Sequence, residues 1–231
     1  MMSDQSPEQF MPAPLPHAYY TQPTLDIARD LLGKTLWRAD ATGIVAGVIV
    51  ETEGYISAID PASHNYRKPS KRSMTMFGPP GHAYVYLTYG MHHCLNVVTE
   101  PAGESAAVLI RAAAPLTGRD QMALRCPRCL PRDLARGPGR LCAAFGLTIA
   151  QNGLDLTGDT LWISEPPNAE PLDPARIATS PRIGITQGID LPWRFFIRDH
   201  PAVSGPAWLN RGQPRPSTVA PSRANSDQNA G

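Results

Sequence analysis

Helical and strand-like periods of apolar residues follow one another along this chain of 231 residues. After Thr24, apolar residues recur every three to four positions: Leu25, Ala28, Leu31 and Leu32. This spacing places them on one face of a helix, which Thr24 can cap and Gly33 can end. Segments rich in β-branched and aromatic residues, separated by turn residues, predict strands at 36–38, 44–55, 82–88, 92–99, 106–112, 161–163 and 195–198.

These elements favour a single mixed α+β domain with a curved, mostly antiparallel sheet and helices packed on it. The strands at 82–88 and 92–99 are close enough in the chain to form a hairpin, with Tyr89 and Gly90 in its turn. A basic stretch at 116–145 is predicted to be helical. Prolines and glycines interrupt it at Pro127, Pro131 and Gly137-Pro138-Gly139.

The two ends of the chain differ from its middle. Residues 1–18 are rich in Pro, Gln and Ser without an apolar period, and we expect a disordered N-terminal segment there. Residues 205–231 are expected to form a disordered tail, because 212–231 lack any apolar cluster. The folded domain is therefore expected at 19–204. The start lacks a signal-peptide pattern and no apolar run could span a bilayer, so a soluble cytoplasmic protein is expected.

Charge is distributed unevenly, although the net charge is only +1. Residues 61–140 contain eleven Lys and Arg against four Asp and Glu, a balance of +7 that leaves −6 for the rest of the chain. Such a segment can form a surface for a polyanion such as a nucleic acid. The alternative is a chance cluster of charges on solvated helices.

The four cysteines do not form a complete metal-binding pattern. Cys126 and Cys129 make a single CxxC pair, whereas a structural zinc site usually needs a second pair. Cys94 and Cys142 lie in apolar contexts that are typical of a core. In an intracellular chain all four are expected to be reduced, and we expect no metal site.

The predicted strand at 44–55 carries candidate chemistry. Side chains alternate along a regular strand, so Glu51, Glu53 and Tyr55 would project from one face, and Val48 and Val50 from the other, toward the core. Two carboxylates on one face can serve as a general acid and a general base. The simpler alternative is that one carboxylate pairs with an arginine and the other is solvated.

Aromatic residues and an imidazole lie close to this strand in the sequence. Tyr84 and Tyr86 share a face of the predicted hairpin, and Tyr89 at its turn has few core neighbours to bury it. A ring at such a tip can fold back onto its own strand or enter a stack of bases. With His64, these rings suggest a pocket for a planar base, and Asn96 on the return strand could read its hydrogen-bonding edges.

Taken in order, these motifs resemble the alkyladenine (3-methyladenine, methylpurine) DNA glycosylase family. The matching pieces are Val50-Glu51-Thr52-Glu53-Gly54-Tyr55, His64, Met76-Phe77 with Pro80-Gly81, Tyr84-Val85-Tyr86-Leu87-Thr88-Tyr89-Gly90-Met91, Cys94-Leu95-Asn96, Leu109-Ile110-Arg111, Gly137-Pro138-Gly139-Arg140-Leu141-Cys142 and Pro181-Arg182-Ile183-Gly184. Each piece alone is unspecific, but together they occur in the family's order across residues 20–204.

The resemblance implies a monofunctional enzyme of base excision repair that flips alkylated or deaminated purines out of double-stranded DNA and removes them by hydrolysis. It implies no metal and no organic cofactor, and a protruding β-hairpin that inserts into DNA. By position, Glu53 matches the general base that activates water. Arg111 matches an arginine that helps to hold this water near the backbone carbonyl of Ile183.

The remaining matches concern the flipped base and the DNA around it. Tyr55, His64 and Tyr86 match the walls that stack around the base. Tyr89 matches the residue that fills the gap left in the double helix. Asn96 matches the group that discriminates against the 2-amino substituent of guanine.

One segment departs from the family's pattern. Residues 68–73 differ from its usual Thr-Pro-Arg-like patch, so phosphate contacts are expected there without a residue-by-residue match: Arg67, Ser70, Lys71 and Arg72. The three lysines of the chain lie outside the pocket motifs, so a Schiff-base lyase step is not expected. We expect a monomer that binds damaged duplex DNA and no membrane, in the cytoplasm and at the nucleoid if the source is bacterial.

Three other functions stay open at this point. The chain could bind nucleic acid without catalysis, in which case Glu53 would be structural. It could hydrolyse sugars with Glu51 and Glu53 as an acid–base pair. It could also be a zinc-dependent protein that uses Cys126 and Cys129.

Overall fold

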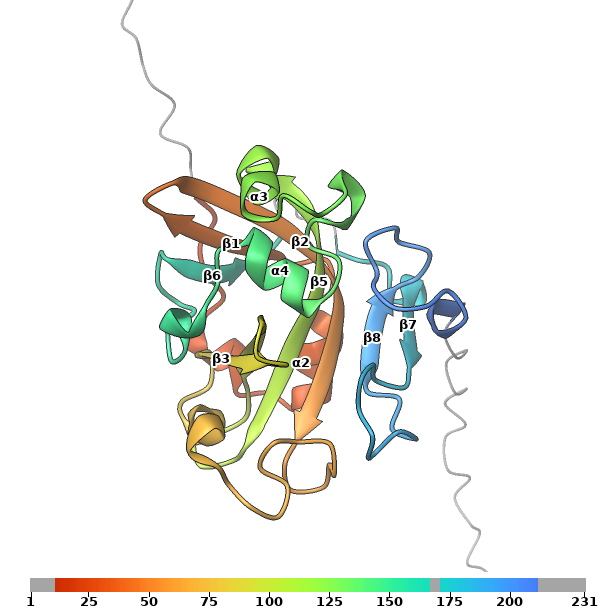
Figure 1. Ribbon diagram of the computed structural model, residues 1–231. Coiled ribbons are helices and arrows are strands. Elements are labelled where there is room, and N and C mark those ends of the chain that lie inside the picture. The colour runs from red at the N-terminus through yellow and green to blue at the C-terminus, as the bar shows by residue number, and fades with distance from the viewer. Residues whose placement is uncertain (1–10, 167–170, 212–231) are drawn as a thin grey trace, which may run out of the picture.

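The computed structural model describes residues 11–166 and 171–211 (Figure 1). The strands are β1 (Thr35–Asp40), β2 (Gly43–Ile56), β3 (Ala83–Thr88), β4 (His92–Val98), β5 (Ala106–Thr117), β6 (Leu161–Ser164), β7 (Ile177–Ser180) and β8 (Arg194–Ile197). The α-helices are α1 (His17–Tyr20), α2 (Thr24–Asp30), α3 (Arg119–Arg125) and α4 (Pro138–Ala144). Short 3-10 helices are η1 (Lys71–Phe77), η2 (Pro131–Asp133), η3 (Ile149–Gln151), η4 (Pro174–Arg176) and η5 (Leu209–Arg211).

All the strands join one sheet that curls into a half-barrel, and every pairing in it is antiparallel. The path through the sheet is β3-β4-β5-β2-β1-β6, and β8 with its partner β7 joins at β2. β2 is long enough for its first half to pair with β1 while Glu51–Glu53 pair with β8. The predicted mostly antiparallel α+β fold is thereby confirmed.

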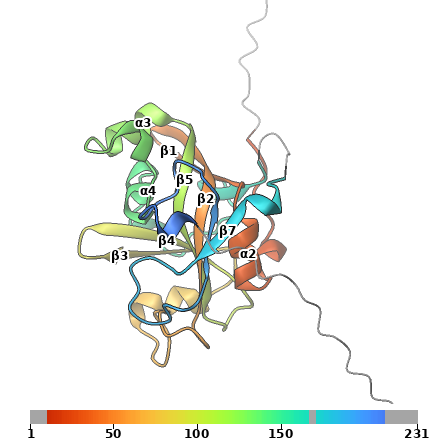
Figure 2. The same ribbon diagram turned by 90° about the vertical axis from the view of Figure 1, so that its right-hand side faces the viewer.

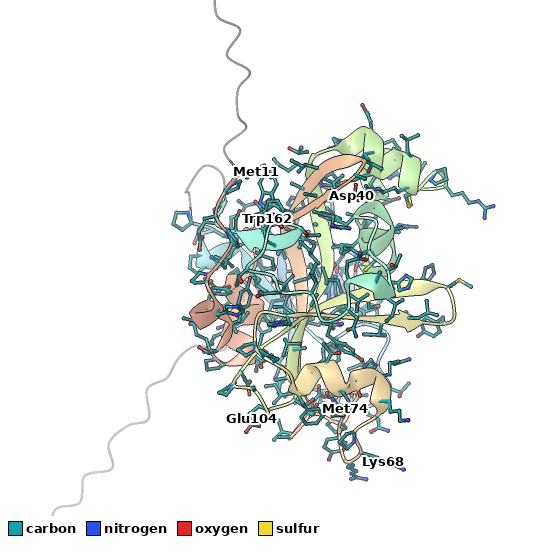
Figure 3. The ribbon with its side chains drawn as sticks, turned by 90° about the vertical axis from the view of Figure 1, so that its left-hand side faces the viewer. Met11, Asp40, Lys68, Met74, Glu104 and Trp162 are labelled. Atoms are coloured by element: carbon teal, nitrogen blue, oxygen red, sulfur yellow. A yellow bond between two sulfur atoms is a disulfide. The ribbon has the colours of Figure 1, made fainter. Side chains whose placement is uncertain are left out.

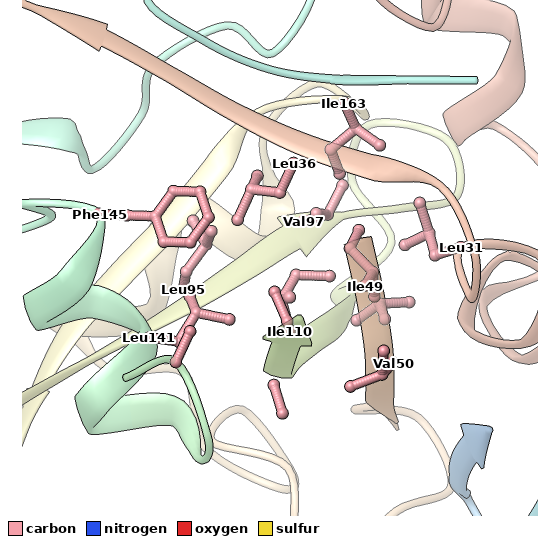
Figure 4. Packing of buried hydrophobic residues seen from close by; sticks show 14 of the residues in the cluster. Leu31, Leu36, Ile49, Val50, Leu95, Val97, Ile110, Leu141, Phe145 and Ile163 are labelled. Atoms are coloured by element: carbon pink, nitrogen blue, oxygen red, sulfur yellow. The ribbon is translucent and has the colours of Figure 1, made fainter. Parts of the chain in front are cut away.

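The core lies between the sheet and the helices that cover it. α2 packs on β2 and β5, and α4 packs on β4 and β5. Figure 4 shows Ile49, Val50 and Ile110 of the central strands in one buried cluster with Leu141 and Phe145 at α4. Burial of these apolar side chains is the main stabilising contribution, at about 1.5–3 kcal/mol for each fully buried one.

The pairing of β2 with β5 shifts register at three places, and two of these are bulges close to Glu51. Ile49 is opposite Ala113 and Glu51 is opposite Ala112, so Val50 is an extra residue in β2; one step further on, Arg111 is the extra residue in β5. The prediction that Val48 faces the core was wrong, because the bulge ends the strict alternation: Val48 is half-buried, and Ile49 and Val50 are both fully buried. Bulges re-aim side chains, and these two lie where the candidate catalytic residues emerge.

The predicted hairpin is confirmed as β3 and β4, and it projects from the sheet. Figures 2 and 3 show it extending sideways, between α4 on one side and η1 on the other. Tyr89 and Gly90 form its turn with φ values of 49° and 68°. Three residues connect Thr88 to its partner His92, and the N–H of Met91 donates to the carbonyl of Thr88 at 3.2 Å. Tyr89 and Gly90 are thus the two central residues of a tight turn, and the left-handed backbone at Tyr89 costs some strain.

Other sequence-based expectations need correction at their ends. Pro23, not Thr24, occupies the N-cap position of α2, without a capping side-chain hydrogen bond; Thr24 is the first helical residue, with its hydroxyl 2.9 Å from that of Thr99. The basic stretch at 116–145 is less helical than expected, because β5 runs to Thr117 and only α3, η2 and α4 follow. The sequence did not predict α1, η1 or β7.

Part of the expected tails falls within the described residues and packs on the sheet. Leu15 is buried, and its N–H donates to the carbonyl of Ile163 at 2.8 Å. Figure 3 shows Met11 beside Trp162. At the other end, the side chain of Asn210 accepts a hydrogen bond from Arg194 at 2.8 Å. Residues 1–10 and 212–231 lie outside the described residues, and the division into domains stays a prediction.

Cys126 and Cys129 form a disulfide, in contrast to the expectation of reduced cysteines; Cys94 and Cys142 are free and buried. While their sulfur atoms are bonded to each other, Cys126 and Cys129 are not thiolate ligands. The described residues contain no group of three or more His, Cys, Asp or Glu side chains arranged to hold a metal ion. Within the same part of the chain, no helix is long and apolar enough to cross a membrane.

Candidate active site

A cavity of about 490 Å³ opens between the end of β2, the β3–β4 hairpin and the loop that follows β7. Its lining includes most of the residues that the sequence selected: Tyr55, His64, Tyr86, Tyr89, Asn96, Arg111 and Ile183. They come from segments far apart in the chain, which the sheet and the two bulges bring together. The volume lies in the usual range for a pocket that binds a small molecule.

Glu53 lies behind this lining and is fully buried. Its Oε2 accepts hydrogen bonds from the Tyr55 hydroxyl at 2.8 Å and from Arg111 Nη1 at 3.2 Å, and its Oε1 accepts the N–H of Ile183 at 2.8 Å. Burial and the neighbouring Glu53 raise the pKa of Tyr55, which keeps its hydroxyl a donor. Three donors that all line or border the cavity therefore fix the carboxylate of Glu53.

Glu51 has a different environment, away from the cavity lining. Its Oε1 accepts hydrogen bonds from Arg194 Nε at 2.6 Å and Arg111 Nε at 3.1 Å, and its Oε2 accepts the N–H of Ser204 at 2.7 Å. Burial alone would raise the pKa of Glu51, but the charges of Arg111 and Arg194 and the Ser204 N–H outweigh it and lower the pKa. Glu51 is thus a fully paired carboxylate that holds Arg111 in place.

Arg111 bridges the two carboxylates that the sequence placed on one face. Its pKa is raised, because the attraction of Glu53 and Glu51 outweighs the burial that would lower it. Neither carboxylate is solvated, so the simpler alternative of one paired and one solvated group was wrong. Glu51 is fully buried and accepts hydrogen bonds from three donors, so it is not free to act as the second catalytic carboxylate of a sugar hydrolase.

His64 and two tyrosines of β3 form an aromatic wall. The ring centroids of His64 and Tyr86 are 4.6 Å apart with the rings edge to face, and those of Tyr84 and Tyr86 are 5.3 Å apart. Nδ1 of His64 lies 2.9 Å from the Tyr84 hydroxyl. Burial raises the pKa of Tyr84 to about 12, and burial together with Arg72 lowers the pKa of His64.

Tyr55 is backed by a buried ion pair that sequence reasoning missed. Arg182 donates to Asp60 with Nη1 at 2.5 Å and Nη2 at 2.7 Å, and its Nη1 also donates to the Gly54 carbonyl at 2.9 Å. Its guanidinium lies 4.6 Å from the centre of the Tyr55 ring. The pair joins the end of β2 to the Pro181–Gly184 motif. That motif contained Arg182, but nothing in the spacing indicated Asp60 as its partner.

The other predicted residues differ in how far they are buried. Asn96 is buried and donates with Nδ2 to the Tyr84 carbonyl at 2.9 Å. Tyr89 is 82% exposed at the hairpin tip, so it does not fold back onto its own strand. Arg67 and Lys71 are exposed. Ser70 caps η1, with its hydroxyl 2.7 Å from that of Ser73.

The basic segment is partly neutralised within the chain. Arg125 pairs with Asp40 at 2.8 Å and Arg136 with Asp133 at 3.1 Å. Figure 3 shows Asp40 next to α3 and Lys68 and Met74 at the far end of the molecule, on the other side of the hairpin. Positive residues therefore lie on both sides of the projecting tip, but fewer of them are available to a ligand than the count suggests.

The site thus combines an aromatic cavity, a buried carboxylate at its base and a projecting hairpin. Residues 18–201 match the family model described as Methylpurine-DNA glycosylase (MPG). The chain belongs to this family, as its motifs predicted.

Similar proteins occur in several organisms. Proteins of Burkholderia lata, Frankia casuarinae and Methanocella arvoryzae are 49%, 45% and 46% identical to this chain over 197, 196 and 195 residues. The matches cover 84%, 81% and 82% of this chain and 92%, 91% and 95% of those proteins. Each carries the name "Putative 3-methyladenine DNA glycosylase".

Proposed function

We propose that this chain is a monofunctional 3-methyladenine DNA glycosylase, which flips damaged purines out of duplex DNA and hydrolyses their N-glycosyl bonds. Its family and relatives support an enzyme of DNA repair that acts on alkylated purines. The observation that carries the finer proposal is one arrangement: Glu53 and Arg111 at the base of an aromatic cavity whose mouth lies at the Tyr89 tip.

Binding begins with removal of the base from the stack. An enzyme cannot reach the glycosyl bond of a stacked nucleotide, so the base must leave the duplex at a cost of a few kcal/mol. Tyr55, His64 and Tyr86 offer ring faces on which a purine can stack. Tyr89, exposed in the turn of the hairpin, fills the vacated space and offsets part of that cost.

Hydrolysis then requires a water molecule beside Glu53. A carboxylate has about four lone-pair positions. Three are used by Tyr55, Arg111 and the Ile183 N–H, which leaves one on Oε1. A water held there donates its proton to Glu53 while its oxygen forms a bond to C1′ and the C1′–purine bond breaks. A base that carries a positive charge leaves as a neutral molecule.

A lyase step is not part of the proposal. A Schiff base needs an amine at the reacting carbon, and lysine is the usual source. Lys34, Lys68 and Lys71 are the lysines of the chain, and none of them lines the cavity formed by the described residues. The products are therefore a free base and an intact strand with an abasic site.

Selectivity and affinity come from the surroundings of the cavity. Asn96 is fixed by its bond to the Tyr84 carbonyl, so it can discriminate against a purine that carries a 2-amino group. Arg67, Ser70, Lys71 and Arg72 contact phosphates on one side of the hairpin. The enzyme acts as a monomer, because the cavity of a single chain already contains every group that the reaction uses.

The test is a panel of duplexes with one lesion each: 3-methyladenine, 7-methylguanine, hypoxanthine or ethenoadenine. We expect free base by mass spectrometry, and strand breaks only after alkali treatment. An undamaged duplex is the control. Release of no lesion by folded protein would refute the proposal, and strand breaks without alkali would refute its monofunctional part.

A further inference from the structure

Arg72 contacts the aromatic wall of the cavity, although it was predicted only as a phosphate ligand. It is the second residue of η1. Its guanidinium lies 5.0 Å from the centre of the Tyr86 ring, and Nη1 donates to the carbonyl of Leu87 at 3.3 Å. Nη2 lies 3.4 Å from Nε2 of His64. Arg72 thus joins η1, the hairpin and the histidine of the wall.

The chemistry of the two groups determines the direction of this last bond. A guanidinium has donors only, so in a hydrogen bond with Arg72 the Nε2 atom of His64 is the acceptor and carries no proton. A neutral imidazole then has its proton on Nδ1, which lies 2.9 Å from the Tyr84 hydroxyl and donates to it. Arg72 on one side and Tyr84 on the other therefore allow a single neutral form of His64.

We propose that Arg72 is a positioning residue, which holds His64 neutral with its proton on Nδ1 so that the wall can accept a positively charged purine. The consequence for substrates rests on the proposed function. A protonated His64 would place one cation beside Arg72 and beside the bound base. Purines methylated at N3 or N7 carry a positive charge in DNA, whereas hypoxanthine and ethenoadenine are neutral, so only the methylated purines would be repelled.

The groups around His64 agree with a neutral ring. Those that contact it are Arg72 from η1 and Tyr84 and Tyr86 from β3. Burial raises the pKa of both tyrosines, so neither supplies a negative charge at neutral pH. His64 as a whole residue is exposed, but partial desolvation of its ring, together with the charge of Arg72, lowers its pKa. Removing Arg72 should therefore raise that pKa, and it also removes the donor to Nε2.

The direct test is nitrogen-15 NMR of the histidine rings in the full-length protein without DNA, with His64→Gln used to assign the signal. We expect a neutral ring protonated on Nδ1. In Arg72→Gln the pKa of His64 should rise by about 0.5 to 1 pH unit, the scale of a lost charge a few ångströms away near the surface. Arg72→Lys keeps a charged donor, so the pKa of His64 in this variant should return most of the way to its wild-type value.

Lys71→Gln is the matched control, because it removes the neighbouring positive charge of η1 without touching the wall. It should leave the tautomer and pKa of His64 unchanged. A wild-type ring protonated on Nε2 would overturn the proposal, and this measurement needs no variant that might misfold. An unchanged pKa in Arg72→Gln would overturn it as well.

Activity gives a second, independent readout. On 3-methyladenine, the rate of Arg72→Gln relative to wild type should fall between pH 7.5 and 6, by up to about threefold for a pKa shift of half a pH unit, because that shift changes the protonation ratio by about threefold. The same ratio should stay constant on hypoxanthine. An equal fall on both lesions would indicate a purely structural role. If wild type excised no lesion, the proposed function would fail, but the NMR result would still decide the link between Arg72 and His64.

Discussion

Replacing Glu53 by Gln tests the proposed chemistry most directly, because the change removes a negative charge but hardly any volume. The new side chain has one acceptor oxygen and one donor NH₂. If the oxygen stays with Tyr55 and Arg111, the NH₂ faces the N–H of Ile183, where Glu53 now accepts at 2.8 Å. One hydrogen bond is then lost and two donors face each other, at a cost of about 1–3 kcal/mol in the free energy of unfolding.

This loss is small enough for the variant to fold. Domains are usually stable by 5–15 kcal/mol, and each kcal/mol corresponds to about 2–4 °C in Tm for a domain of this size. Arg111 also keeps Glu51 as a partner at 3.1 Å. Affinity for lesion DNA should survive, because the aromatic walls and the hairpin tip are unchanged.

The excision rate should fall far more than the stability. A general base contributes about 10²- to 10⁴-fold, which is roughly 2.7–5.5 kcal/mol at 1.36 kcal/mol for each tenfold. Single-turnover excision from a lesion duplex measures this loss, and fluorescence anisotropy measures binding. Tyr55→Phe is the control: it keeps the ring and removes one donor to Glu53, so the rate should fall about tenfold or less. Folded Glu53→Gln with a rate within tenfold of wild type would refute the role of Glu53 as the base.

Three further variants test the surroundings of the site. Glu51→Gln should lower the free energy of unfolding by about 3–5 kcal/mol, because Arg111 and Arg194 stay buried without their shared carboxylate; a thermal melt unchanged within 3 °C would contradict this. The lowered pKa of Glu51 adds stability that is complete above its unfolded pKa of about 4.3 and is lost as pH falls through the folded pKa, so urea melts of wild type below pH 4.3 should fall more steeply with pH than those of Glu51→Gln. Lys71→Gln should reduce the slope of log affinity against log salt by about 0.9, and an equal slope would place Lys71 away from phosphates. Tyr89→Ala should leave Tm unchanged because the ring is 82% exposed, yet lower excision most for lesions that still pair well; equal losses on paired and mispaired lesions would exclude the wedge role.

The sequence alone predicted the elements whose signals are local. The periods of apolar residues predicted α2, the long strand β2 and the hairpin, because each pattern lies within a single segment. Tyr89 followed by Gly90 marked the turn for the same reason. The site residues came from motifs whose order matched a family, and the cavity contains most of them.

What the sequence could not predict depends on distant partners. The partner of Glu51 that identifies it as structural, Arg194, lies 143 residues away in the chain. The bond between Arg182 and Asp60 spans 122 residues. The bulges at Val50 and Arg111 arise only when β2 and β5 pair, so a strict alternation of side chains could not reveal them. Both carboxylates were therefore predicted to share a face, but their different roles were not.

The charges buried around the cavity explain how a reactive carboxylate can persist there. Glu51, Glu53 and Asp60 meet three guanidinium groups, those of Arg111, Arg182 and Arg194. Buried charges are tolerated when paired, and here the positive and negative groups balance. Because Arg111 is held by Glu51 as well as by Glu53, Arg111 still has a charged partner when the charge at Glu53 is removed. Loss of charge at Glu51 leaves Arg194 without its carboxylate. The two variants should therefore separate cleanly: Glu53→Gln should affect mainly the excision rate, and Glu51→Gln mainly the stability.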